Sequence, residues 1–341
     1  MGRQLKTTDE LENRFVDDRV KVLIPKFEAL APYKRKKRED GDQNEGVEGW
    51  KYLAVREAAL LKAQYGAQSM TCLRQITALK KGLKLAAKTH VKDHANLHPV
   101  GTIITHFGEA LSFLFSEYTI AKNERYRDAV RERTTPENRL ELDLSQFLKQ
   151  AVEVLQQVAN GASKEDIEWR DVSCALALVT GRRMGEIHLS GEFRLLGEYE
   201  VGFKGQLKGK SRKVKVEGSK VALRDYEFPI PTLVRAELVT KGLEWLEAND
   251  KRFERGEDPE RVNRRWSKVL SERVKEEWSF MPDVTYHKFR GAYFRLCVEN
   301  VNLDAYDWED YAKAILGDDD SATIKAYKRF VIKPGSVTRV L

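Results

Sequence analysis

The chain has 341 residues, of which 41% are hydrophobic and 33% are charged. This length allows two domains with cores of their own. The formal net charge of +7 favours an anionic partner, and nucleic acid is the commonest one. Three widely spaced cysteines exclude a disulfide scaffold and a zinc-finger site. We find no apolar run of the roughly 20 residues that a membrane span needs and no secretory signal, so we expect a cytoplasmic protein without a membrane partner.

The first 135 residues predict an α-helical N-terminal domain. Apolar residues recur at helical spacing over residues 1–31, 50–90 and 99–131. Between the first two stretches, basic residues followed by acidic and polar ones predict a mobile loop over 33–48. The basic half of this loop either contacts phosphates or is a solvated charge run.

One predicted helix of this domain has a basic face. Residues 68–71 predict a cap for a helix that runs to about Lys88, with Leu85 among its buried positions. Basic side chains on one face suit the DNA backbone, although a solvated lysine face has the same pattern. The candidate DNA-binding residues on it are Arg74, Lys80, Lys81 and Lys84.

A second domain is predicted to begin after residue 135, because residues 134–138 contain a proline and break the helical pattern. Residues 144–158 then predict an amphipathic helix, and 171–179 predict a strongly apolar one. Between 191 and 228, alternating apolar residues and glycines predict a small antiparallel sheet of about three strands. The predicted fold is therefore mainly α with a small antiparallel β-sheet: a helical DNA-binding domain (1–135), an α+β catalytic domain (136–331) and a tail (332–341).

Five short motifs in the second domain supply residue types that suit a reaction at a phosphodiester. They are TGRRMGE at 180–186, FKGQLKGK at 203–210, YHKFRGAY at 286–293, ILGDDD at 315–320 and IKAYKRF at 324–330. Two arginines from different elements can bind the charge of a reacting phosphate. A tyrosine can attack the phosphorus and store the bond as a phosphotyrosine. A lysine or a histidine can give a proton to the leaving oxygen.

The first of these motifs resembles the first arginine box of the tyrosine recombinases, T-G-x-R-x-G/S-E. The match implies that Arg183 binds the phosphate rather than Arg182, which we expect to contact the DNA beside it, and that Glu186 braces the site. Lys208 matches the general-acid lysine that these enzymes carry on a β-hairpin. Lys204 and Lys210 are rivals for that role, or bind DNA.

The later motifs resemble the second box and the nucleophile of the same enzymes. His287 and Arg290 form an H-x-x-R and would face one way on a helix. Tyr327 matches the nucleophile position, after a Leu-Gly turn. The family usually has a histidine directly after this turn, but here the residue is Asp318. An acid there would repel the phosphate unless it is protonated or paired with Lys288 or Lys325.

Three stretches narrow the resemblance to the telomere resolvases, also called protelomerases. They are GRRM at 181–184, GEF at 191–193 and GQLK at 205–208, and the resemblance extends over residues 140–331. It implies that a homodimer binds a palindromic telomere junction in double-stranded DNA. Each tyrosine forms a 3′-phosphotyrosyl link, and the freed 5′-hydroxyls rejoin to the opposite strand of the same arm as hairpin ends.

The resemblance also implies where the protein acts and whether it needs a metal or a cofactor. The phosphotyrosine keeps the bond energy, so we expect no metal and no cofactor. Such enzymes maintain linear phage or plasmid replicons, so we expect a location in a bacterial or phage-infected cell, associated with the nucleoid. The tail at 332–341 leaves no room for the extra C-terminal domain of larger relatives, and it could reach the partner subunit.

Three other functions share parts of this pattern. An ordinary tyrosine integrase, which is a site-specific recombinase, has the same chemistry and a different product. A type IB topoisomerase would act as a monomer without sequence specificity. A catalytically impaired DNA-end-binding protein would keep the fold and lose turnover through Asp318.

Overall fold

The structure is a computed structural model that describes residues 8–30, 45–90, 94–208, 213–216, 219–254, 256–301, 307–317 and 321–336. Contacts divide the chain into two units, Met1–Tyr126 and Arg127–Leu341, and each is described by itself. The division falls inside helix α5 (Ser116–Thr134), which has no buried residue. The boundary predicted after residue 135 comes at the end of this helix and stays a prediction. Within the described ranges, no helix has both the length and the apolar character needed to cross a membrane.

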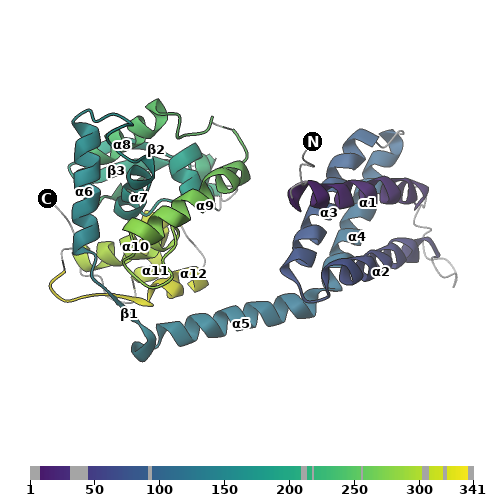
Figure 1. Cartoon of the computed structure of the whole chain (residues 1–341). Helices are drawn as coiled ribbons and strands as arrows, with labels where there is room; N and C mark the ends of the chain where they lie inside the picture. The colour runs from purple at the N-terminus through teal and green to yellow at the C-terminus, as the bar shows by residue number, and fades with distance from the viewer. Residues whose placement is uncertain are drawn as a thin grey trace, which may run out of the picture. The chain divides into compact units, whose positions relative to one another are not determined.

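The first unit contains a bundle of four helices around its own core (Figure 1). They are α1 (Thr8–Leu30), α2 (Glu45–Tyr65), α3 (Met70–His90) and α4 (His94–Phe113). Leu23, Phe27 and Phe107 are fully buried where these helices meet. The predicted cap of α3 is present, because the hydroxyl of Ser69 accepts a hydrogen bond from the Cys72 amide at 3.0 Å.

Two predictions for this unit were wrong in part. Helix α2 begins at Glu45, so residues 45–48 are helical instead of forming the end of a loop, as suits acidic residues at a helix start. Residues 33–44 of that predicted loop lie outside the described residues. Leu85 is 65% exposed, because the buried stripe of α3 passes through Leu79 and Leu83 instead.

The second unit surrounds a central helix with other helices, which confirms the mainly α prediction. Every residue from 171 to 180 of α7 is buried, which explains the apolar sequence of this stretch. Helices α6, α8, α9 and α10 pack around it. The helices of this unit are η1 (Pro136–Asn138), α6 (Ser145–Ala159), α7 (Trp169–Thr180), η2 (Glu186–Ser190), η3 (Leu223–Asp225), α8 (Ala236–Ala248), α9 (Pro259–Glu277), α10 (Lys288–Val301), α11 (Trp308–Leu316) and α12 (Ser321–Tyr327).

The predicted small antiparallel sheet is present with three strands, and a separate hairpin is inserted in the chain between its second and third strands. Strands β2 (Glu192–Gly197), β3 (Glu200–Lys204) and β6 (Phe228–Pro231) form an antiparallel sheet in the order β2-β3-β6. Strands β4 (Lys213–Val216) and β5 (Ser219–Ala222) form a separate hairpin. Because β3 pairs with both β2 and β6, the chain leaves the sheet after Lys204 and reaches the hairpin through a loop.

A further pair of strands was not predicted. Strand β1 (Leu140–Leu142) pairs in parallel with β7 (Phe330–Ile332), the strand that follows α12. The amide of Lys333 then donates to the Leu142 carbonyl at 2.9 Å. The first residues of the predicted tail are therefore bound to the start of the same unit, and residues 337–341 lie outside the described part of the chain.

A buried carboxylate ties the central helix to the end of α9. Asp171 accepts hydrogen bonds from Arg273 Nε at 2.8 Å and from Trp278 Nε1 at 2.9 Å. Asp171 is 8% exposed and Trp278 is fully buried. This single carboxylate therefore satisfies a guanidinium and an indole at the same time.

We expect Asp171→Ala to lower the free energy of unfolding by about 3 kcal/mol, because it removes the acceptor of the buried Trp278 indole and leaves the Arg273 guanidinium with a longer ion pair to Glu277, at 3.5 Å. Chemical denaturation of the two proteins measures this difference. Asp128→Ala is the matched control, since Asp128 forms an exposed ion pair with Arg131. Its loss should be below about 1 kcal/mol. Equal losses for the two variants would show that burial does not strengthen the Asp171 interactions.

Candidate active site

The first arginine motif begins where the central helix ends. Gly181 closes α7 in the left-handed conformation, with φ 65°. A Cβ atom at this position would lie 2.2 Å from Tyr293 Cδ1, so a larger residue does not fit. The turn that follows contains Arg182 and Arg183 and leads into η2. The backbone thus fixes both arginines at the C-terminal end of a buried helix.

Arg182 is almost completely buried, at 1% exposure. Its Nε donates to the Thr180 carbonyl at 3.1 Å and its Nη2 to the Ile315 carbonyl at 2.6 Å. Its guanidinium also lies 4.5 Å from the centre of the Phe203 ring. Burial and the charge of Arg290 lower the pKa of Arg182 to about 10, so it stays charged at neutral pH. Within the described residues, its Nη1 atom has no hydrogen-bond partner.

Arg290 joins the ends of two helices. It is 1% exposed. Its Nη1 donates to the Gly181 carbonyl at 2.7 Å, and its Nη2 donates to the Leu316 carbonyl at 2.6 Å. Helix α11 ends at Gly317, which is also left-handed, with φ 67°. Carbonyls at helix C-termini carry partial negative charge, so they both orient and stabilise this guanidinium.

Glu186 connects the arginine motif to the loop after β3. Its carboxylate accepts from Arg183 Nη1 at 2.9 Å and from the Arg183 amide at 3.0 Å. It also accepts from the Leu207 amide at 3.3 Å. Burial alone would raise the pKa of Glu186, but the charges of the three nearby arginines lower it below its usual value. Glu186 is therefore ionised and holds Arg183 beside this loop.

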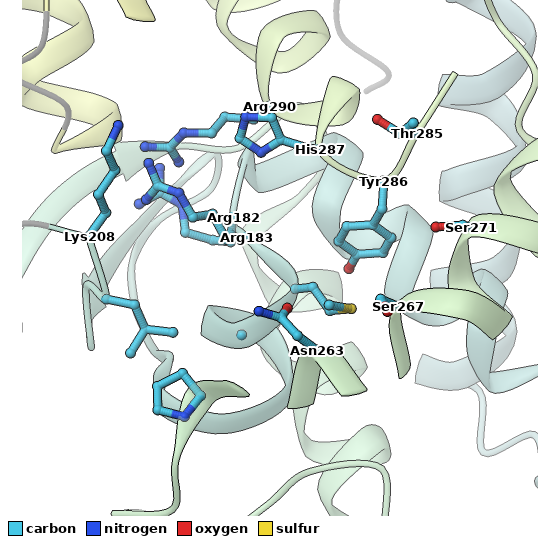
Figure 2. Close-up of a pocket in the computed structure, with 14 residues that line it drawn as sticks. Arg182, Arg183, Lys208, Asn263, Ser267, Ser271, Thr285, Tyr286, His287 and Arg290 are labelled. Atoms are coloured by element: carbon cyan, nitrogen blue, oxygen red, sulfur yellow. The ribbon is translucent and has the colours of Figure 1, made fainter. Parts of the chain in front are cut away.

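Arg182, Arg183 and Arg290 line one pocket of about 550 Å³ (Figure 2). The arginine motif, the loop after β3, helix α9 and the start of α10 all contribute to its wall. Five candidate residues from three distant stretches meet there: Arg182, Arg183, Lys208, His287 and Arg290. In Figure 2 the three guanidinium groups and the Lys208 side chain extend toward the same space. The pocket suits an anion that several donors bind at once.

Other predicted residues lie elsewhere. Lys204 ends β3 and is not part of the pocket wall. Lys208 was predicted on a hairpin. It lies in the loop between β3 and β4, and β3 pairs with β2 and β6 rather than with β4. Lys210 and Asp318 lie outside the described residues.

Tyr327 belongs to the core and does not line the pocket. It is 6% exposed, and its ring centre lies 5.4 Å from that of Phe294. It also packs on α10, since a Cβ atom at Gly291 would lie 3.2 Å from Tyr327 Cδ1. The candidate nucleophile therefore contacts the residue next to Arg290.

Helix α9 supplies pocket residues that the sequence did not reveal. Asn263, Ser267 and Ser271 line the wall at intervals of four residues, which places them on one face of the helix. The sequence does contain a signal for these pocket residues, because small neutral residues repeat within a strongly charged stretch. Tyr286 also lines the pocket, but its hydroxyl is bonded to Ser173 Oγ at 2.8 Å, and burial raises its pKa well above the usual value. Tyr286 is thus a poor nucleophile.

The predicted basic face of α3 is largely accessible. Arg74, Lys81 and Lys84 are exposed on this helix. Lys80 is half-buried, and its Nζ donates to Ser112 Oγ at 2.9 Å, so it helps to join α3 to α4. Three of the four predicted DNA-binding residues of this helix are therefore free to meet solvent.

Three arginines, a lysine and a histidine from a mainly helical unit surround one pocket, and this set of donors suits a phosphate-like anion. The family model of the telomere resolvase ResT/TelK catalytic domain matches residues 138–330, so the chain belongs to this family. This match confirms the resemblance seen in the motifs.

Two phage proteins are similar in sequence. The protelomerase of Escherichia phage N15 is 28% identical over 229 residues, which is 61% of this chain and 34% of that protein. The protelomerase of Klebsiella oxytoca phage phiKO2 is 32% identical over 177 residues, which is 46% of this chain and 25% of that protein. The matched regions span only about a third or less of the length of these relatives.

Solved protelomerase structures share the fold. Protelomerase TelA covalently complexed with substrate DNA has a TM-score of 0.60 and 18% identity, over 92% of this chain and 95% of that one. Protelomerase TelK complexed with substrate DNA has a TM-score of 0.50 and 16% identity, over 98% of this chain and 72% of that one. At identities this low, the TM-scores establish a common fold and nothing more.

Proposed function

We propose that this protein is a telomere resolvase that cuts a palindromic duplex DNA site and closes the ends as hairpins. The observation that supports this most is the pocket, which gathers Arg183, Lys208, His287 and Arg290 within the matched catalytic domain. The relatives point the same way. One protelomerase TelA structure is covalently complexed with substrate DNA, and another holds a DNA hairpin product.

In the proposed mechanism, Arg183 and Arg290 bind the oxygens of the scissile phosphate, and His287 donates a further hydrogen bond. Negative charge grows on these oxygens as the phosphorus is attacked, so donors fixed in advance lower the barrier. Arg290 is fixed by two helix-end carbonyls, and Arg183 is fixed by Glu186. Arg182 has a buried Nη1 atom, without a partner among the described residues, that can add another donor.

The proposed exchange of bonds at the phosphorus is the one that the family resemblance implies. The Tyr327 hydroxyl gives its proton to water as its oxygen bonds to the phosphorus, the bond to the 5′-oxygen breaks, and Lys208 gives this oxygen a proton. In the reverse sense, a 5′-hydroxyl of the opposite strand attacks the phosphotyrosine and releases the tyrosine. One bond replaces another of the same kind, so the reaction uses no metal and no nucleotide. Asp318 remains a candidate catalytic residue outside the described part of the chain.

Because Tyr327 does not line the pocket, its hydroxyl must come closer to a bound phosphate before it can attack. Helix α12, which ends at Tyr327, has seven residues and follows the Gly317 turn. We infer that DNA binding shifts this short helix. Fluorine NMR of fluorotyrosine at position 327 tests the shift, since an unchanged signal in the DNA complex would contradict it.

The N-terminal unit completes the proposed DNA contact. The exposed Arg74, Lys81 and Lys84 on α3 are proposed to bind the phosphate backbone. Two copies of the chain are proposed to act on the two halves of the palindrome. Action inside a bacterial or phage-infected cell, near the nucleoid, stays a prediction.

The DNA product tests the proposed function against its alternatives. The target is first recovered from a plasmid library of inverted repeats by isolating DNA that becomes linked to the protein. The linear product, made without metal or ATP, is then run on a denaturing gel. Strands that fold back to duplex after melting show hairpin ends and support a resolvase. Recombined circles indicate an integrase, relaxed plasmid indicates a topoisomerase, and bound but unchanged DNA indicates an impaired end-binding protein.

A further inference from the structure

The loop that carries Lys208 is tied down at each of the residues that precede it. Ser190 Oγ donates to the Gly205 carbonyl at 2.5 Å, and the Gly205 amide donates to the Arg224 carbonyl at 3.1 Å. The Leu207 amide is bound by Glu186 at 3.3 Å. Gln206 lies between Gly205 and Leu207. Of the described hydrogen bonds that hold these three residues, the one from the Gln206 side chain reaches α11.

Gln206 is fully buried, and its side chain ends on the last turn of α11. Its Nε2 donates to the Leu316 carbonyl at 3.0 Å. A Cβ atom at Gly317 would lie 2.9 Å from this same nitrogen, so the amide packs directly on the turn. Within the described residues, the Gln206 Oε1 atom has no hydrogen-bond partner. A buried amide with a missing bond is costly, and an apolar side chain would avoid the loss, so the amide calls for a functional reason.

The Leu316 carbonyl supplies that reason, because it accepts two hydrogen bonds. One comes from Gln206 Nε2, and the other from Arg290 Nη2 at 2.6 Å. A single oxygen atom therefore links the loop of the candidate general acid to the guanidinium that is proposed to bind the phosphate. Lys208 itself is exposed at the pocket wall, so its position depends on the loop that holds it.

We propose that Gln206 is a positioning residue that sets the place of Lys208 relative to Arg290 through the Leu316 carbonyl. This inference rests on the proposed function. The lysine must lie within hydrogen-bond reach of the departing 5′-oxygen to give it a proton as the bond to phosphorus breaks. When the Gln206 bond is lost, the loop keeps its ties at Gly205 and Leu207 but loses the one to α11. Lys208 can then shift relative to Arg290, and proton transfer becomes inefficient while phosphate binding is kept.

The test compares two leaving groups. Gln206→Met keeps the volume of the side chain and removes the donor. On the duplex that the wild-type protein cleaves, we expect this variant to form the tyrosyl adduct about a hundredfold more slowly, as for a misplaced catalytic group. The second substrate has sulfur in place of the bridging 5′-oxygen at the cleavage site. A thiolate leaves without a proton, so we expect the variant to come within about threefold of the wild-type rate on it.

Three other variants make the comparison specific. Lys208→Ala should show the same rescue by sulfur, and Arg290→Ala should stay slow on both substrates, because sulfur does not replace phosphate binding. Gln75→Leu is the matched control: Gln75 is another buried glutamine, 2% exposed, whose Oε1 has no partner in the described part of the chain. It should cleave both substrates at the wild-type rate.

The inference is overturned if Gln206→Met is equally slow on both substrates, or is as fast as the wild type on the oxygen substrate. Should this variant fail to fold, Gln206→Asn retains a polar amide that is too short for Leu316, and the same selective rescue is expected of it. A wild-type protein that forms no adduct on either substrate would instead contradict the proposed function. The two failures are thus distinguishable.

Discussion

Tyr327→Phe is expected to abolish the covalent protein–DNA adduct and to leave DNA binding intact. The substitution removes only the hydroxyl that is proposed to attack the phosphorus. The ring stays, so its packing on Phe294 and on the backbone at Gly291 is preserved. Denaturing gel electrophoresis with labelled DNA measures the adduct, and a gel-shift titration measures binding. No other group in the proposed mechanism can form a phosphotyrosine.

Tyr311→Phe is the matched control for this experiment. Tyr311 lies on α11, and its ring centre is 6.3 Å from that of the same Phe294. The control removes a tyrosine hydroxyl from the same cluster, and adduct formation should continue. An adduct formed by Tyr327→Phe would show that another residue is the nucleophile. Loss of the adduct in both variants would point to the packing of this cluster rather than to the Tyr327 hydroxyl.

Arg290→Ala has the second largest expected effect, a fall in the cleavage rate of about a thousandfold, which is typical for the loss of a charge-stabilising donor. The guanidinium is held between the ends of α7 and α11, so it is already in place for the proposed contact with the phosphate. Arg183→Ala should have an effect of the same order. Single-turnover cleavage at saturating protein separates this effect from weaker DNA binding.

Arg295→Ala is the control for the loss of a buried arginine from the same helix. Arg295 is 6% exposed, lies over the Trp308 ring at 4.3 Å and is bonded to Glu299. Its loss should reduce stability while cleavage stays within about tenfold of the wild type, since it touches no reacting group. A loss below about tenfold for Arg290→Ala would show that this residue does not bind the scissile phosphate.

The sequence could predict residues whose roles are local. Arg183, His287 and Arg290 occur in short motifs, and the long helices have clear periodicity. The role of Arg182 was harder to see, because its carbonyl partner at Ile315 is 133 positions away. Arg182 was predicted to contact DNA, yet much of its guanidinium binds backbone carbonyls. A motif gives the residue type, whereas packing decides which donors remain for a ligand.

Long-range pairing explains the other differences. The short strands β1 and β7 have three residues each, too few to show an alternating pattern, and their partners are at opposite ends of the unit. The pocket wall formed by α9 depends on which face of that helix turns inward. Its sequence is strongly charged, and the residues of this helix that line the pocket are uncharged. Neither feature is encoded by neighbours along the chain.

The pairing of β1 with β7 has a consequence for which DNA end moves. The Arg329 carbonyl, two positions after Tyr327, accepts a hydrogen bond from the Leu140 amide at 2.8 Å, so Tyr327 is attached to its own unit on its C-terminal side. In the proposed mechanism, a 3′ end joined to this tyrosine would therefore stay with the subunit that made the cut, and the 5′ end would change partner. In a mixed dimer, a Tyr327→Phe subunit should not borrow the tyrosine of an Arg290→Ala partner. Cleavage restored in such a mixture would show that subunits exchange nucleophiles.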